Sequence, residues 1–202
     1  CYVVITSSAV ALGFGRYFSS LFGSGYLVGV IGLFIFLSLI MVYGIKKSAR
    51  LASMISLLEV TGLLIVIYTG FPYLGTINYF EAPDLAGVFE ASTLIFFAFL
   101  GFEDIVRLSQ ETKEAEKTTP KALLIAIFFT VLLYVCVAIT AVSVLDFRIL
   151  GLSGVPLADV VAVSFGSDAF VLMSWIALFS TMNTVLVVLL GGSRIVYGMA
   201  YA

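Results

Sequence analysis

Long runs of apolar residues alternate with short polar segments along the whole chain. An α-helix needs a run of roughly 20 mostly apolar residues to cross a bilayer. The pattern predicts six such helices, at about residues 1–14, 26–45, 51–70, 88–108, 121–144 and 169–197. We therefore expect an all-α integral membrane protein in which residues 1–202 form a single transmembrane domain.

The segments between these runs differ in character. Residues 13–25 are rich in Gly and Ser and predict a turn, which leaves the first helix short for a crossing. Pro120 suits the first turn of the fifth helix. Residues 156–166 predict a short interfacial or re-entrant helix. The chain opens inside an apolar run without Met and stops just after another, so we expect it to be a piece of a larger protein.

The basic residues predict the orientation, because Lys and Arg concentrate in the short cytoplasmic loops of membrane proteins. With six alternating crossings, Arg16 and Arg148 fall on one side of the membrane. The larger group falls on the other side: Lys46, Lys47, Arg50, Arg107, Lys113, Lys117, Lys121 and Arg194. We expect loops 46–50 and 107–121 to be cytoplasmic in a multi-pass protein of the plasma membrane.

Composition agrees with a membrane protein and excludes several classes of function. The chain is 62% hydrophobic and 11% charged, whereas soluble domains carry roughly 25% charged residues. It has no His, and Cys1 and Cys136 are too few for a disulfide framework or a zinc site. No basic cluster indicates a nucleic-acid partner, and no nucleophile–base pair, nucleotide motif or metal-ligand spacing supports an enzyme, a cofactor or a metal site.

Residues 91–104, ASTLIFFAFLGFED, begin as a membrane helix. The apolar run then reaches Gly101, and the charged residue Glu103 follows within the predicted span. Charge inside a membrane segment usually marks a substrate or ion path, and glycine allows the backbone to leave helical geometry. Unwound carbonyls at this depth could accept hydrogen bonds from a substrate ammonium group, as in the broken helices of transporters. The alternative is that the phenylalanines face lipid, Gly101 aids helix packing, and Glu103 pairs with Arg107.

Glu59 is a carboxylate within an apolar helix, in SLLEVTGLLIVI. It lies roughly 12 Å along the helix, counted from residue 51 at 1.5 Å per residue. Glu59 could carry a coupling proton, or it could coordinate a cation together with hydroxyl groups of the last helix. The alternative is a structural Glu that bonds a neighbouring Ser or reaches toward the cytoplasm.

The last predicted helix contains the polar run Ser180, Thr181, Asn183 and Thr184. Ser180 and Thr184 are four residues apart and share a helix face, so they could ligate sodium or hold a substrate. We rank both ahead of Asn183 as ion-coupling candidates. The alternative is that these hydroxyl groups only hold membrane helices together.

Several stretches of this sequence resemble the amino acid–polyamine–organocation (APC) permeases. FFAFLGFE at 96–103 is similar to that family's pattern F-[FW]-[AS]-[FY]-x-G-[FV]-E, and it is followed by a similar Glu-rich loop with a Pro before the next helix. The other similar stretches, in the family's order, are KKS at 46–48, SGVPLAD at 153–159, and the parts of the eighth helix at 181–184 and 193–200. Residues 114–115, Glu-Ala, depart from the family's frequent Asn-Pro.

The resemblance implies the leucine-transporter fold of inverted repeats, with this chain as a fragment covering helices three to eight of twelve, one of them discontinuous. It implies that Phe97 is the aromatic lid. It also implies that the substrate-contacting backbone belongs to Ala98, Phe99, Leu100 and Gly101. It implies that Glu103 is a gate residue. Phe97 stands where some arginine antiporters carry Trp, which disfavours a guanidinium substrate held by cation–π stacking.

We therefore expect a secondary active transporter that moves amino acids or related amines through the lipid bilayer by alternating access. The coupling ion would be a proton or sodium, through Glu59, Ser180, Asn183 and Thr184. Two alternatives remain: a membrane sensor that binds an amino acid on the same scaffold without moving it, and an ion channel. The sequence does not indicate an oligomeric state.

Overall fold

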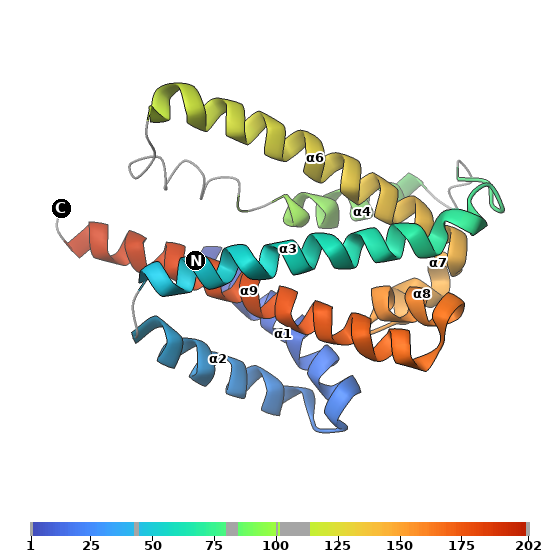
Figure 1. The fold of residues 1–202 in the computed structure, drawn as a ribbon, viewed down its shortest axis with the longest axis horizontal. Coiled ribbons are helices and arrows are strands. Elements are labelled where there is room, and N and C mark those ends of the chain that lie inside the picture. Colours follow the sequence, from blue (N-terminus) through green and yellow to red (C-terminus); the bar gives the residue numbers. More distant parts are fainter. Residues whose placement is uncertain (1, 43–44, 80–84, 100, 102–113, 201–202) are drawn as a thin grey trace.

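The computed structural model describes all residues except 1, 43–44, 80–84, 100, 102–113 and 201–202 (Figure 1). The described chain is helical and contains no strand, which confirms the all-α prediction. Its elements are α1 (Tyr2–Phe22), α2 (Tyr26–Val42), α3 (Ile45–Gly70), the 3-10 turn η1 (Phe71–Tyr73), α4 (Leu85–Ala98), α6 (Ala115–Val144), α7 (Phe147–Leu152), α8 (Pro156–Phe165) and α9 (Ser167–Ala200).

Helices α3 and α9 lie side by side along the long axis of the molecule and form its centre (Figure 1). Helix α6 packs on the other side of α3, and α1 packs across α9 and carries α2 on its outer side. The largest fully buried side chains come from α2, α3, α8 and α9, and they include Leu37, Val66, Val160, Val185 and Leu186. Many other apolar side chains are exposed, as expected for helices whose solvent is lipid.

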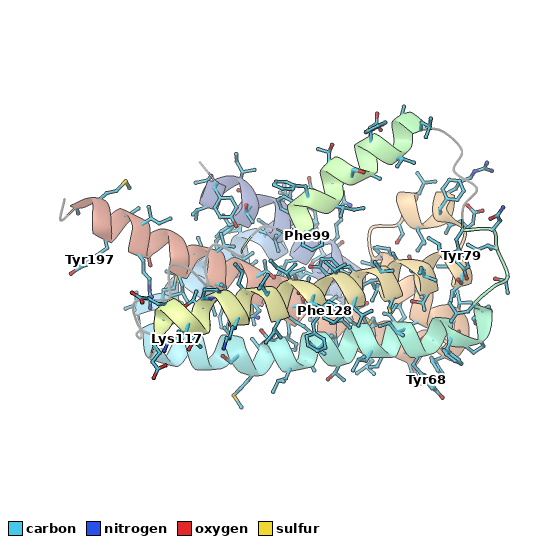
Figure 2. All side chains as sticks on the ribbon, turned by 90° about the horizontal axis from the view of Figure 1, so that it is seen from above. Tyr68, Tyr79, Phe99, Lys117, Phe128 and Tyr197 are labelled. Carbon is cyan, nitrogen blue, oxygen red and sulfur yellow. The ribbon has the colours of Figure 1, made fainter. Side chains whose placement is uncertain are left out.

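The helix ends and the short helices lie at the two ends of the bundle. Figure 1 places the starts of α3 and α6 and the end of α9 at the left, with η1, α7 and α8 at the right. Lys117 and Tyr79 mark these two ends in Figure 2. Residues 46–50, predicted as a loop, lie in the first turns of α3, at the same end of the bundle as the described start of α6. Arg16, predicted on the opposite side, lies beside the turn between α7 and α8, where its Cδ atom is 3.7 Å from a Cβ built on Gly154.

The sequence pattern predicts six membrane crossings. Fewer of the described helices are long and apolar enough to cross a membrane. Three described helices are so alone, namely Ala52–Tyr73, Ala115–Val144 and Ser167–Ala200. Helices α1 and α2 are so together as a pair bent by 117°, which gives three or four spans by length and composition. The six crossings stay a prediction, because the described part of α4 has only 14 residues.

The predicted end of the first helix is wrong. Helix α1 continues to Phe22, and the turn predicted over residues 13–25 is confined to the three residues before α2. The glycines serve close packing, since a Cβ on Gly15 would lie 2.6 Å from the carbonyl oxygen of Tyr26. A Cβ on Gly29 would likewise lie 2.9 Å from the Phe18 side chain. Small residues allow membrane helices to approach closely in this way.

Two further helix starts were placed too late. Helix α3 begins at Ile45 instead of 51, and α6 begins at Ala115 instead of 121. Pro120 therefore lies inside α6, not in its first turn. The loss of one backbone donor is tolerable there because Pro120 is close to an exposed helix end, where water can satisfy the free carbonyl. The predicted short helix appears as α8, which ends before Gly166 at φ +80°.

Gly15→Ala should destabilise the full-length protein by about 1–3 kcal/mol, because the added methyl group overlaps backbone that cannot move aside. The measurement is the midpoint of thermal unfolding in detergent. Gly32→Ala is the matched control, because a Cβ on Gly32 meets no atom within 4 Å. Equal midpoints for the two variants would contradict the close α1–α2 crossing.

Candidate functional site

Helix α4 ends at Ala98, inside the segment predicted to be broken. The amide of Phe99 closes a tight turn by donating to the carbonyl oxygen of Phe96 at 3.1 Å. Gly101 has φ +113°, a backbone conformation that residues with a side chain rarely adopt. The last carbonyls of a helix have no partner within it, and at this end the Ala98 carbonyl accepts from a side chain of α6. Leu100 and the predicted gate Glu103 lie outside the described residues.

Tyr134 of α6 holds the end of α4. Its hydroxyl group donates to the carbonyl oxygen of Ala98 at 3.1 Å. Its ring meets the Phe99 ring edge-on, with centroids 5.5 Å apart and planes at 67°. In Figure 2, Phe99 lies above the middle of α6. Phe97 remains 38% exposed.

Glu59 lies deeper in its helix than the sequence estimate. It is the fifteenth residue of α3, because the helix begins at Ile45. A rise of 1.5 Å per residue puts it roughly 21 Å from the start of the helix. The 26-residue helix is roughly 39 Å long, so Glu59 is close to its middle. The apolar part of the helix that is long enough to span a membrane starts at Ala52, so Glu59 lies roughly 10 Å inside it, where an unpaired charge is costly.

Asn183 of α9 is the main partner of this carboxylate. Its Nδ2 atom donates to Glu59 Oε1 at 2.9 Å and approaches Ser56 Oγ at 3.3 Å. Ser180 provides a second side-chain hydrogen bond to Glu59. Asn183 is only 4% exposed, and its buried Oδ1 atom has no hydrogen-bond partner among the described residues. The result is a cluster of polar side chains around one carboxylate, between α3 and α9.

Thr184 does not belong to this cluster. Its side chain is exposed, and its hydroxyl group donates within α9, to the carbonyl oxygen of Ser180 at 3.2 Å. The sequence ranked Thr184 and Ser180 ahead of Asn183, whereas the geometry brings Asn183 and Ser180 to Glu59. An α-helix turns by about 100° per residue, so neighbouring positions face different directions.

Tyr134 of α6 was missed by the sequence analysis. Helix α6 also packs against α3, the helix that carries Glu59. One signal was available in LLYVCV, because a tyrosine hydroxyl within an apolar helix usually finds a hydrogen-bond partner. The Tyr134 hydroxyl group joins the end of α4 to α6.

Comparison with known proteins points to a single family. The family described as amino acid permease matches residues 1–201. An uncharacterized protein of Methanocaldococcus jannaschii is 29% identical over 98% of this chain and 47% of its own length. A branched-chain amino acid permease of Bacillus subtilis is 29% identical, over 78% of this chain and 34% of that protein.

A methylthioribose transporter of Bacillus subtilis is 26% identical over 71% of this chain and 36% of its own length. The chain therefore spans between about a third and half of the length of these relatives. The family match extends over nearly every residue, the fold is entirely helical where it is described, and the interrupted helix coincides with the quoted sequence pattern. The chain belongs to the amino acid permease family.

Proposed function

We propose that the protein is a secondary active transporter that moves an amino acid or a related amine across the plasma membrane by alternating access. The observation that carries the proposal is the ending of α4 at Ala98, followed by Gly101 at φ +113°, beside the middle of α6. Backbone away from helical geometry is tolerated at membrane depth where it faces protein or a water-filled cavity. A site for a small polar solute accounts for such a feature.

The chemistry of the break suits a zwitterionic amino acid. Carbonyl oxygens at a helix end can accept hydrogen bonds from an ammonium group, and the Ala98 carbonyl keeps a second lone pair beside its bond from Tyr134. Phe97 and Phe99 offer apolar surface for the substrate side chain. The relatives named for branched-chain amino acids and methylthioribose agree with a small organic substrate. In this proposal Glu103 acts as a gate, as its position after the break suggests.

The Glu59 cluster would couple transport to an ion. A proton could bind the carboxylate, or a sodium ion could bind between the carboxylate and its oxygen neighbours. The second possibility requires the Asn183 amide to turn over, so that its unpartnered Oδ1 atom and not Nδ2 faces the carboxylate, because a hard cation takes oxygen ligands. Thr184 has no part in this coupling, since its hydroxyl group turns back on α9.

The rivals are a membrane amino acid sensor and an ion channel, and one experiment separates all three. The full-length protein is reconstituted in liposomes, and binding and uptake of labelled amino acids are measured side by side under a sodium gradient or a pH gradient. We expect saturable uptake that needs one of the two gradients. Binding without uptake would establish the sensor, and flux without saturation would establish the channel. We expect loops 46–50 and 107–121 to face the cytoplasm.

A further inference from the structure

A hollow of about 520 Å³ opens at the end of the bundle where α6 leads into α7. Sites for small organic molecules have volumes of this order. One wall comes from the connection between η1 and α4, and the other comes from the end of α6 and the start of α7. The lining includes Ile77 and Tyr79 on the first wall and Val142, Asp146, Phe147 and Arg148 on the second. Tyr79 marks this end of the bundle in Figure 2, opposite to Lys117.

Hydrogen bonds hold the two walls together. A hydroxyl group has a single proton to donate, and that of Ser143 on α6 goes to the carbonyl oxygen of Ile139 at 2.7 Å. The Tyr79 hydroxyl group therefore donates to Ser143 Oγ, also at 2.7 Å, while it accepts from the backbone amide of Gly75 at 2.9 Å. These bonds fix the connection against α6. The hollow is thus preformed, which lowers the cost of binding a ligand.

A carboxylate and a guanidinium group line this one hollow. Asp146 caps α7, because its Oδ1 atom accepts from the backbone amide of Arg148 at 2.8 Å. The cap positions the carboxylate, and one such bond leaves it further lone pairs. The guanidinium carbon of Arg148 lies 5.5 Å from the centre of the Phe147 ring, an arrangement that cation–π attraction favours. The two opposite charges are therefore held separately, on the backbone of α7 and on an aromatic ring.

We propose that this hollow is a second binding site, for a zwitterionic amino acid. Arg148 binds the carboxylate of the amino acid through parallel N–H donors, and Asp146 accepts from its ammonium group. The apolar members of the lining contact its side chain. An anion alone would be repelled by Asp146, and a cation alone by Arg148, so a molecule that carries both charges fits best. This recognition does not use the break in α4, so the site is additional to the one in the proposed function.

The hollow and the break lie at different levels of α6. Tyr134 bonds the end of α4, whereas Val142 lines the hollow. At 1.5 Å per residue, these two positions are roughly 12 Å apart along the helix axis. Arg148 is predicted to lie on the side of the membrane opposite to the cytoplasm. The second site therefore takes amino acids from the outer solution.

Protection of a thiol placed in the hollow tests the site in intact cells that express the full-length protein. Ile77→Cys puts the thiol in the lining, in a background whose native cysteines are replaced by serine. A membrane-impermeant thiol reagent is added outside, with leucine, glycine or glutamine present one at a time. At twice its Kd, an amino acid that binds should slow alkylation by about threefold, because the reagent reacts with the empty hollow.

Two variants remove one charge each. Arg148→Gln and Asp146→Asn should each abolish the protection. Both keep the cap of α7, because the cap uses the backbone amide of residue 148 and Asn caps helices as well as Asp. The amine and the carboxylic acid that correspond to leucine without one of its charged groups should not protect. Leu152→Cys is the matched control, since Leu152 is 90% exposed at the end of α7, outside the lining, and its alkylation should not respond to amino acids.

A thiol at position 77 that the reagent does not reach from outside would overturn the second site. So would alkylation that no amino acid slows, equal protection in Arg148→Gln, or equal protection by leucine and its carboxylic acid. Each of these results leaves the transporter proposal intact, because uptake in liposomes is measured separately. Protection without any uptake would overturn the transporter and leave the second site in place.

Discussion

Gly101→Leu should abolish substrate uptake by the full-length protein while the protein still inserts into the membrane. Gly101 has φ +113°, and a side chain in such a region costs of order 1–3 kcal/mol. The variant can escape this strain by returning to helical geometry, which would pair the carbonyl groups that the substrate needs. We expect uptake in liposomes to fall to background and substrate binding to fall with it.

Gly87→Leu provides the control for this experiment. Gly87 lies in the first turn of α4, and a Cβ at this position meets no atom within 4 Å. Its replacement adds the same side chain to the same helix without demanding an unusual backbone conformation. Normal uptake by Gly101→Leu would contradict the proposal that the break in α4 binds the substrate.

Glu59→Gln should leave substrate binding intact and remove the dependence of uptake on the ion gradient. The amide has nearly the same shape as the carboxylate and can still bond Asn183 and Ser180, so the fold is preserved. It cannot bind a proton at neutral pH, and it is a weak ligand for a cation. We expect exchange of labelled for unlabelled substrate to continue, whereas accumulation against a gradient is lost.

Glu116→Gln is the matched control, because Glu116 is an exposed residue at the start of α6. It changes the net charge of the protein by the same amount, away from the site. Accumulation by Glu59→Gln that still responds fully to the gradient would discard Glu59 as the coupling residue. The Glu59 cluster between α3 and α9 would then have only a structural role.

The break in the helix and the importance of Glu59 could be predicted from the sequence, because both features violate the local apolar pattern. Glycine followed by charge interrupts an apolar helix at residues 101–103, and Glu59 stands alone in an apolar run. Such violations are costly in lipid, so they persist where another part of the structure compensates for them. The end of α4 at Ala98 and the hydrogen bond from Asn183 to Glu59 are these two compensations.

The partners of these residues were harder to predict. Helix α9 is apolar around most of its circumference, so its sequence does not show which face meets α3. Asn183 and Thr184 are adjacent, and a rotation of about 100° decides between them. Tyr134 lies in a uniformly apolar helix. Its hydrogen bond to Ala98 depends on how α6 lies relative to α4. Contacts between distant segments leave no periodic trace in the sequence.

Gly15 shows that a glycine can be read in two ways. A Gly-rich stretch predicts a turn in water, where exposed backbone is easily solvated. In lipid a glycine also permits close helix contact, and a Cβ on Gly15 would lie 2.6 Å from the carbonyl oxygen of Tyr26. Propensity alone cannot separate a turn from a close helix crossing, since both exploit the missing side chain.

The most direct test of the account is an experimental structure of the full-length protein in a lipid nanodisc with its amino acid bound. We predict that α4 is interrupted after Ala98 and that the substrate ammonium group lies within hydrogen-bonding distance of the carbonyl oxygen of that residue. We also predict that the Tyr134 hydroxyl group donates to the same carbonyl oxygen. A continuous helix through Phe99 and Gly101, with the substrate bound elsewhere, would contradict the account.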